Sequence, residues 1–182
     1  MYPVEISGPR LAWRELTTGD ADALIDMLSD PGLFRYAADQ ELPDVETYRG
    51  FLAEQIEAAR TPERHRYKLG ITVDGVIAGM GGLEMTSATA TAAEIGYLLA
   101  PAYWGGGMGT EAASLLVDLA FDRLKLHRVF AGADPANHAS IRVLEKIGMR
   151  YEGTRREDVF KDGKWRDSVT YAILETDARP AR

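Results

Sequence analysis

The sequence predicts an α/β (α+β) fold in which one mixed β-sheet carries helices on both faces. Three observations support this fold class: apolar residues recur at helical spacing in several segments, β-rich runs lie between those segments, and a glycine-rich loop joins a strand to a helix in the middle of the chain. The predicted order is β-α-α-β-β-β-α-β-α-β-β. A chain of 182 residues has the length of one domain, so we expect a single domain over residues 1–182.

The N-terminal part of the chain is predicted to form a strand and two helices. Residues 11–16 suit a strand, and Asp20 can then cap a helix that stops at the Asp-Pro-Gly sequence of residues 30–32. A second helix is expected over residues 44–60, where apolar side chains again recur at helical spacing before Pro62. The segment between these helices is short and polar, as expected of a connection.

The middle of the chain is predicted to form three strands. Two β-rich runs, residues 67–73 and 76–85, are joined by Asp74-Gly75, a dipeptide that favours the type I′ turn of a hairpin. A third strand is expected over residues 93–99, after a loop of small and polar residues.

The C-terminal part is predicted to contribute two helices and three strands. A helix over residues 109–124 is followed by a strand over residues 128–133. A shorter helix over residues 140–147 ends at Gly148, since glycine is favoured just beyond a helix. The last two strands are expected to turn at Asp162-Gly163.

Composition and charge narrow the class of protein. The chain has no cysteine, which excludes disulfides, thiolate metal sites and a cysteine acyl-enzyme. Its formal net charge of −7 argues against a nucleic-acid partner, which needs a basic face. No segment is long and apolar enough to span a bilayer, and residues 1–10 do not resemble a secretory signal, so we expect a cytoplasmic protein without a membrane partner. No metal site is expected, because His65, His127 and His138 lack the spacing of metal ligands.

The strongest local signal is a glycine-rich loop at residues 104–112, which reads Trp-Gly-Gly-Gly-Met-Gly-Thr-Glu-Ala. Glycines let a ligand approach the backbone closely, and the free amides and dipole at a helix start favour a pyrophosphate. A tight turn without a ligand is the structural alternative. A Walker loop is excluded because Gly109 is followed by Thr110 and Glu111 without a lysine, and the dinucleotide pattern fails because Thr110 takes the place of its third glycine.

Three segments together resemble the GNAT superfamily of N-acetyltransferases, and within it the Rim-type subgroup that acetylates ribosomal-protein N-termini, with its small-molecule-modifying relatives. Residues 93–99 resemble the strand that pairs with the pantetheine arm, residues 104–112 resemble the pyrophosphate loop (Gln/Arg)-x-x-Gly-x-(Gly/Ala), and residues 137–149 resemble the segment after the next strand. The resemblance covers almost the whole chain. It implies a GNAT-like, mostly antiparallel sheet and acetyl-CoA as the co-substrate, without a metal.

The loop departs from the superfamily pattern in a way that bears on phosphate binding. Trp104 takes the position of the usual Gln or Arg, and Gly106 takes a position where many members carry a basic residue. The resemblance therefore implies that backbone amides carry more of the phosphate binding. Arg142 and Lys146 could reach the 3′-phosphate of the coenzyme, or they could be solvated helix residues. The residues that the resemblance assigns to the cofactor are Tyr97, Leu98, Leu99, Trp104, Gly105, Gly106, Gly107, Met108, Gly109, Thr110, Asn137 and Ser140.

Acetyl transfer to an amine needs a proton acceptor, a site for the oxyanion and a proton donor for the thiolate. The resemblance places Glu94 and Glu84 on adjacent strands beside the acyl group, where partial burial would raise the pKa of a carboxylate toward neutrality. Glu94 is therefore the first candidate for the acceptor and Glu84 the second, directly or through water; the alternative is that both are polar residues on an exposed strand face. Ser140 resembles the serine to which some members assign the donor role, and the alternative is that it caps the helix. We expect the oxyanion at a backbone amide near Leu98 or Leu99.

The resemblance implies direct transfer, in a ternary complex, to a primary amine of a small molecule or of a protein N-terminus. Residues 34–51 and 155–165 are expected to shape the acceptor site, and they carry no motif that would identify the acceptor. The alternative function is a non-catalytic GNAT-like sensor or scaffold that binds acyl-CoA. Sequence does not fix the oligomeric state, although a homodimer is common in the subgroup.

Overall fold

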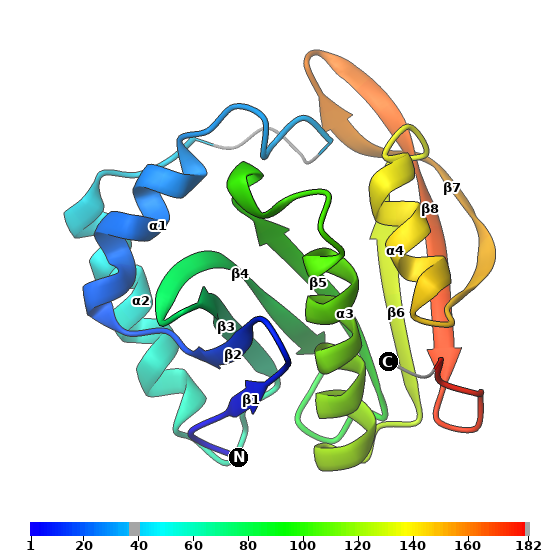
Figure 1. Cartoon of the computed structure of the whole chain (residues 1–182), viewed down its shortest axis with the longest axis horizontal. Helices are drawn as coiled ribbons and strands as arrows, with labels where there is room; N and C mark the ends of the chain where they lie inside the picture. The colour runs from blue at the N-terminus through cyan, green and yellow to red at the C-terminus, as the bar shows by residue number, and fades with distance from the viewer. Residues whose placement is uncertain (37–40, 181–182) are drawn as a thin grey trace.

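An eight-stranded sheet forms the framework of the protein, whose computed structural model describes residues 1–36 and 41–180 (Figure 1). Along the sheet the strands follow the order β1-β2-β3-β4-β5-β6-β8-β7. Among the described residues, β5 and β6 run parallel and every other neighbouring pair is antiparallel, which confirms the mostly antiparallel sheet. The strands are β1 (Glu5–Ser7), β2 (Ala12–Glu15), β3 (Arg66–Val73), β4 (Val76–Met85), β5 (Ala92–Leu99), β6 (Arg128–Ala133), β7 (Arg150–Lys161) and β8 (Lys164–Leu174).

Helices cover both faces of the sheet, as predicted. One face carries α1 and α2, and the other carries α3 and α4 (Figure 1). Alternation along β3 accounts for the two layers: Leu69 and Ile71 point into the core beneath α3, while a Cβ on Gly70 between them would contact Leu16 on the α1–α2 side. The helices are α1 (Ala21–Leu28), α2 (Val45–Ala59), α3 (Met108–Asp118) and α4 (His138–Lys146).

The predicted elements occur in the predicted order, and one strand was missed. β1 has three residues, which is too short for an alternating pattern to be visible in the sequence. The Asp74-Gly75 and Asp162-Gly163 turns both have positive φ at their two central residues, as a type I′ turn requires. The helix expected over residues 109–124 is α3 followed by a single π-helical turn, Leu119–Arg123.

The capping prediction for Asp20 is wrong. Asp20 directly precedes α1, but its carboxylate makes no capping bond to that helix. The carboxylate instead accepts the backbone N–H of Thr17 at 2.7 Å and pairs with the Arg14 guanidinium at 2.8 Å. Burial raises the pKa of Asp20, and the hydrogen bonds from Arg14 and Thr17 outweigh that effect, so the pKa lies below its ordinary value.

The parallel pair β5–β6 opens soon after it forms. Only residues 92–94 of β5 pair with β6, opposite residues 128–130, although β5 continues to Leu99 and β6 to Ala133. Figure 1 shows the two strands diverging from this point. β5 leads through the glycine-rich loop into α3, and β6 leads into α4, so both helix N-termini lie at the open end.

Candidate active site

A cavity of about 1100 Å³ lies at the open ends of β5 and β6. Two cofactor candidates in the glycine-rich loop, Gly106 and Met108, are not among its lining residues, whereas Arg142 and Lys146 of α4 are. The predicted cofactor residues that line the cavity are Tyr97, Leu98, Leu99, Trp104, Gly105, Gly107, Gly109, Thr110, Asn137 and Ser140. The three segments identified in the sequence therefore meet at one cavity.

The glycine-rich loop turns sharply into α3. Gly105 and Gly107 adopt φ values of +83° and +81°, which favour glycine, and Gly107 is the residue that precedes the first turn of α3. A tight turn is thus part of what the glycines do. Because Gly105, Gly107 and Gly109 also line the cavity, the N-terminus of α3 faces a space in which an anion can be bound.

Arg10 and Glu111, which the sequence did not mark as site residues, hold the glycine-rich loop in place through hydrogen bonds. The buried Glu111 carboxylate in the first turn of α3 accepts the Arg10 backbone N–H at 2.8 Å and the Arg10 Nε–H at 2.7 Å. The Leu11 N–H donates to the same carboxylate at 3.3 Å. Arg10 Nη1 also donates to the carbonyl oxygen of Gly106 in the loop. The hydrogen bonds thus join the β1–β2 connection, the loop and α3.

The charge on Glu111 is stabilised by these contacts. Burial raises the pKa of the Glu111 carboxyl, but the hydrogen bonds from Arg10 and Leu11, with the Arg10 charge, outweigh burial and leave the pKa below its ordinary value. Glu111 is therefore ionised at neutral pH and forms an ion pair with Arg10, in which the carboxylate is buried and the guanidinium is about half exposed.

Tyr97 and Trp104 line the cavity rather than serving the core alone. The Tyr97 hydroxyl lies against the start of α3, since a Cβ on Gly109 would come within 2.5 Å of it. Burial raises the pKa of Tyr97 to about 12, so the phenol stays protonated at neutral pH. Trp104 is half exposed, and its indole N–H donates to the carbonyl oxygen of Leu99 at 2.6 Å.

The capping alternative for Ser140 is wrong, because Asn137 caps α4. The Asn137 side-chain oxygen accepts the Ser140 backbone N–H at 3.1 Å. Ser140 is the third residue of the helix, half buried, and lines the cavity. Its hydroxyl is therefore not the cap.

The expected partial burial of Glu84 and Glu94 is also wrong. The two carboxylates lie opposite each other on β4 and β5, both are exposed, and neither lines the cavity. Glu84 pairs with Arg66 at 2.7 Å. Side chains of β5 alternate, and Ala93 and Ile95 point into the core beneath α3, so Glu94 points to the opposite face. Sequence could not assign this face in advance.

The cavity also includes residues that the sequence marked only as an unidentified acceptor region. Residues 34–36, 161 and 162 of the expected acceptor segments contribute to the lining, together with residues 31–33 and 166 just outside those segments. Residues 37–40 of the expected acceptor segment lie outside the described residues. Asp167 and Tyr171 do not line the cavity: Asp167 accepts the Glu157 N–H at 2.9 Å, and the Tyr171 ring is buried.

Residues 10–150 match the acetyltransferase (GNAT) domain. The chain belongs to the GNAT acetyltransferase family. It is 39% identical over 134 residues to YjcK of Bacillus subtilis (strain 168), a probable N-acetyltransferase, with 73% of this chain and 74% of YjcK covered. The spermidine N(1)-acetyltransferase of Escherichia coli (strain K12) is 29% identical over 105 residues, which cover 58% of this chain and 56% of that enzyme. RimJ of Mycobacterium smegmatis, solved in complex with CoA-disulfide, superposes with a TM-score of 0.86 at 26% identity, over 96% of this chain and 90% of RimJ.

This GNAT protein is therefore an acetyl-CoA-dependent acetyltransferase, and its GNAT-like fold is the one expected from the sequence. Within residues 1–36 and 41–180, no group of three or more His, Cys, Asp or Glu side chains could hold a metal ion. No helix in that part of the chain is long and apolar enough to cross a membrane.

Gly105 offers a test of whether this GNAT cavity binds the coenzyme pyrophosphate. We expect Gly105→Asp to weaken CoA binding by more than about 10-fold, because a carboxylate on the cavity wall repels the phosphates. Isothermal titration calorimetry measures the effect. Gly75→Asp is the matched control, since Gly75 has a similar φ of +81°, an equally open Cβ position and a place in the distant β3–β4 turn. Equal affinities in the two variants would contradict a pyrophosphate site at Gly105.

Proposed function

We propose that the protein transfers the acetyl group of acetyl-CoA to a single primary amine, by direct attack within the cavity. In this proposal the pyrophosphate lies on the loop of residues 104–112, and the pantetheine arm runs between β5 and β6. A cytoplasmic location goes with the proposal, since direct transfer needs a supply of acetyl-CoA. The CoA complex of the relative RimJ supports the cofactor.

The observation that best supports the proposal is that β5, within the described residues, has backbone groups without a partner strand beyond the point where it separates from β6. The Ala100 N–H donates to Ala78 of β4 at 2.9 Å, and the residues of an antiparallel strand turn their backbone groups alternately to one neighbour and the other. Ile95, Tyr97 and Leu99 therefore turn their backbone groups toward β6, which has already separated. An extended pantetheine arm can bind there as an added strand would.

The reaction can be written with the groups that face this opening. The amine nitrogen attacks the thioester carbonyl carbon, the carbonyl oxygen becomes an oxyanion, and the C–S bond then breaks. Of the two amides expected at the oxyanion, that of Leu99 turns to the opening and that of Leu98 turns to β4, so we assign the oxyanion to Leu99. Ser140 is proposed to protonate the leaving thiolate. Tyr97 is the second candidate, because its phenol keeps its proton.

Removal of the amine proton is assigned to Glu94 through water. Glu94 is the last β5 residue paired with β6 and lies five residues before Leu99, about 17 Å along the strand. That separation is too long for direct contact with an amine at the thioester. Water in the opening could connect the two, because Glu94 is exposed on the face opposite α3.

The charges of the lining bear on the acceptor. Among the described lining residues, Asp162 is the only carboxylate, and it pairs with Arg166 at 3.0 Å. Arg35 and Lys161 also line the cavity and add positive charge, and Lys161 Nζ lies 3.9 Å from the Asp162 carboxylate. A polyamine would be repelled by such a lining, so we propose an acceptor with one amine, either a peptide α-amine or a small-molecule amine without further positive charge.

An acceptor panel tests the function. Purified protein with acetyl-CoA is expected to release free thiol with peptides bearing a free α-amine or with neutral monoamines, and to act faster on them than on spermidine. Thiol release and product mass are measured together. CoA binding without transfer to any amine would favour the acyl-CoA sensor, and a preference for spermidine would overturn the charge argument.

Ser140→Ala tests the proton donor. Since Asn137 caps α4, this variant should keep its melting temperature, whereas Asn137→Ala should lose about 1 kcal/mol of stability. The kcat of Ser140→Ala should fall by about 100-fold or more, the usual size of acid–base assistance. The defect should shrink with an acyl donor whose thiol is more acidic, because that thiolate departs with less protonation. An equal defect with both donors would move the role to Tyr97 or to water.

Glu94→Gln tests the proton acceptor. We expect kcat to fall at neutral pH with little change in the affinity for acetyl-CoA, because the amide cannot accept the proton. Glu84→Gln is compared in the same assay. A loss confined to Glu84→Gln would exchange the two roles, and full activity in both variants would exclude these carboxylates.

A further inference from the structure

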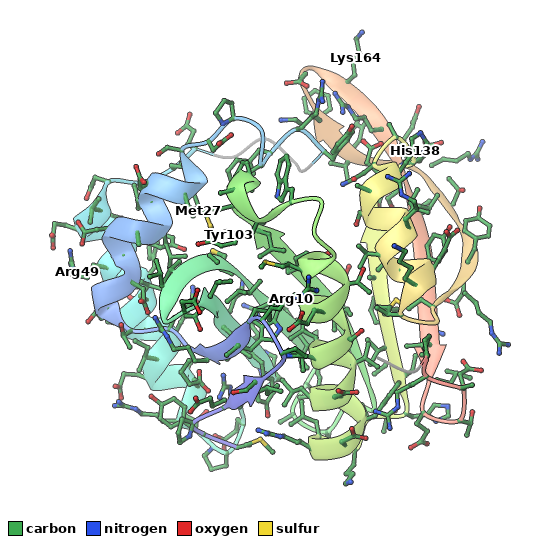
Figure 2. All side chains as sticks on the ribbon, viewed as in Figure 1. Arg10, Met27, Arg49, Tyr103, His138 and Lys164 are labelled. Carbon is green, nitrogen blue, oxygen red and sulfur yellow. The ribbon has the colours of Figure 1, made fainter. Side chains whose placement is uncertain are left out.

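The sequence left the loop without the basic residue that many relatives carry, and the structure supplies a basic residue from elsewhere. Arg10 comes from the β1–β2 connection and reaches the loop more than ninety residues later in the chain, against the first turn of α3 (Figure 2). Its guanidinium contacts the loop at the Gly106 carbonyl oxygen, and a Cβ on Gly107 would lie 3.6 Å from Arg10 Nη2.

The contact between Arg10 and the loop lies outside the cavity lining. Gly105 and Gly107 line the cavity, whereas Gly106 and Arg10 do not. The peptide bond between Gly106 and Gly107 is trans, so its C=O and N–H point in opposite directions. Because the Gly106 C=O points to Arg10, the Gly107 N–H points away from Arg10, and Gly107 itself lines the cavity.

We propose that Arg10, held by Glu111, is a positioning residue for the coenzyme: it fixes the Gly106–Gly107 peptide so that the Gly107 N–H donates to the pyrophosphate. This inference rests on the proposed binding of the pyrophosphate at the loop. Glycine on both sides leaves this peptide free to rotate, so without the Arg10 contact the amide could turn away from the ligand. The positive charge at the carbonyl end also polarises the peptide and strengthens the N–H as a donor.

Glu111 makes this arrangement stable. Its carboxylate accepts hydrogen bonds from Nε–H and the backbone N–H of Arg10. The guanidinium is thereby oriented so that Nη1 donates to the loop. The Glu111 side chain is only 7% exposed, so the ion pair is shielded from solvent on one side. A lysine at position 10 would offer a point charge in place of the planar fork and could not hold both partners in this geometry.

The test compares ligands with and without the pyrophosphate. We expect Arg10→Gln and Glu111→Gln to weaken CoA binding by about 10-fold or more in calorimetry, since a charge-assisted hydrogen bond is lost. The kcat/KM with S-acetyl-pantetheine, which lacks the pyrophosphate, should stay near that of the unmodified protein. Arg10→Lys should recover only part of the affinity, and it serves if Arg10→Gln does not fold.

Arg14→Gln is the matched control. Arg14 of β2 forms a comparable ion pair with Asp20, the residue before α1, so this variant should lose stability and keep its CoA affinity. Unchanged CoA affinity in Arg10→Gln would overturn the inference, and so would an equal loss with CoA and S-acetyl-pantetheine. If the unmodified protein itself does not bind CoA, the proposed cofactor site fails, which is a different result.

Discussion

The parallel ladder between β5 and β6 ends after three residue pairs, and the site is arranged around that early end. A continuous ladder would leave no space between the strands and would use the backbone groups of β5 within the sheet. Because the strands separate, the loop after β5 and the helix after β6 face one cavity. The core beneath α3 and α4 contains buried residues from strands on both sides of the opening, so the opening does not divide that core.

Most of the fold could be predicted because its signals are local. The Asp74-Gly75 and Asp162-Gly163 turns, the apolar spacing of α2 and the glycine after α4 each depend on neighbours in sequence. The errors occurred where a side chain had a choice of partners. Asp20 pairs with Arg14 of the preceding strand in place of capping α1, and Asn137 takes the cap that Ser140 could have made. Both choices depend on contacts that residue type alone does not determine.

The site, like the fold, has a part that local sequence signals predict and a part that depends on distant contacts. The loop of residues 104–112 was predicted because glycine spacing before a helix is a local pattern, and ten of the assigned cofactor residues line the cavity. The carboxylates were harder, since a shift of one residue changes the strand face, and Glu94 proved to be exposed. Arg10 could not be found from sequence, because nothing near it indicates a partner so far along the chain.

The Arg10 contact also limits how the loop can be reused. A designer who transplanted residues 104–112 onto another strand–helix pair would carry over the glycines and the first turn of the helix, but not the guanidinium behind them. The grafted segment could adopt the same turn with the central peptide rotated either way. A functional graft would have to include a second chain segment, equivalent to residues 8–11, and a buried carboxylate to orient its arginine. The smallest fragment that could be transplanted with its function therefore consists of two segments that are far apart in the sequence.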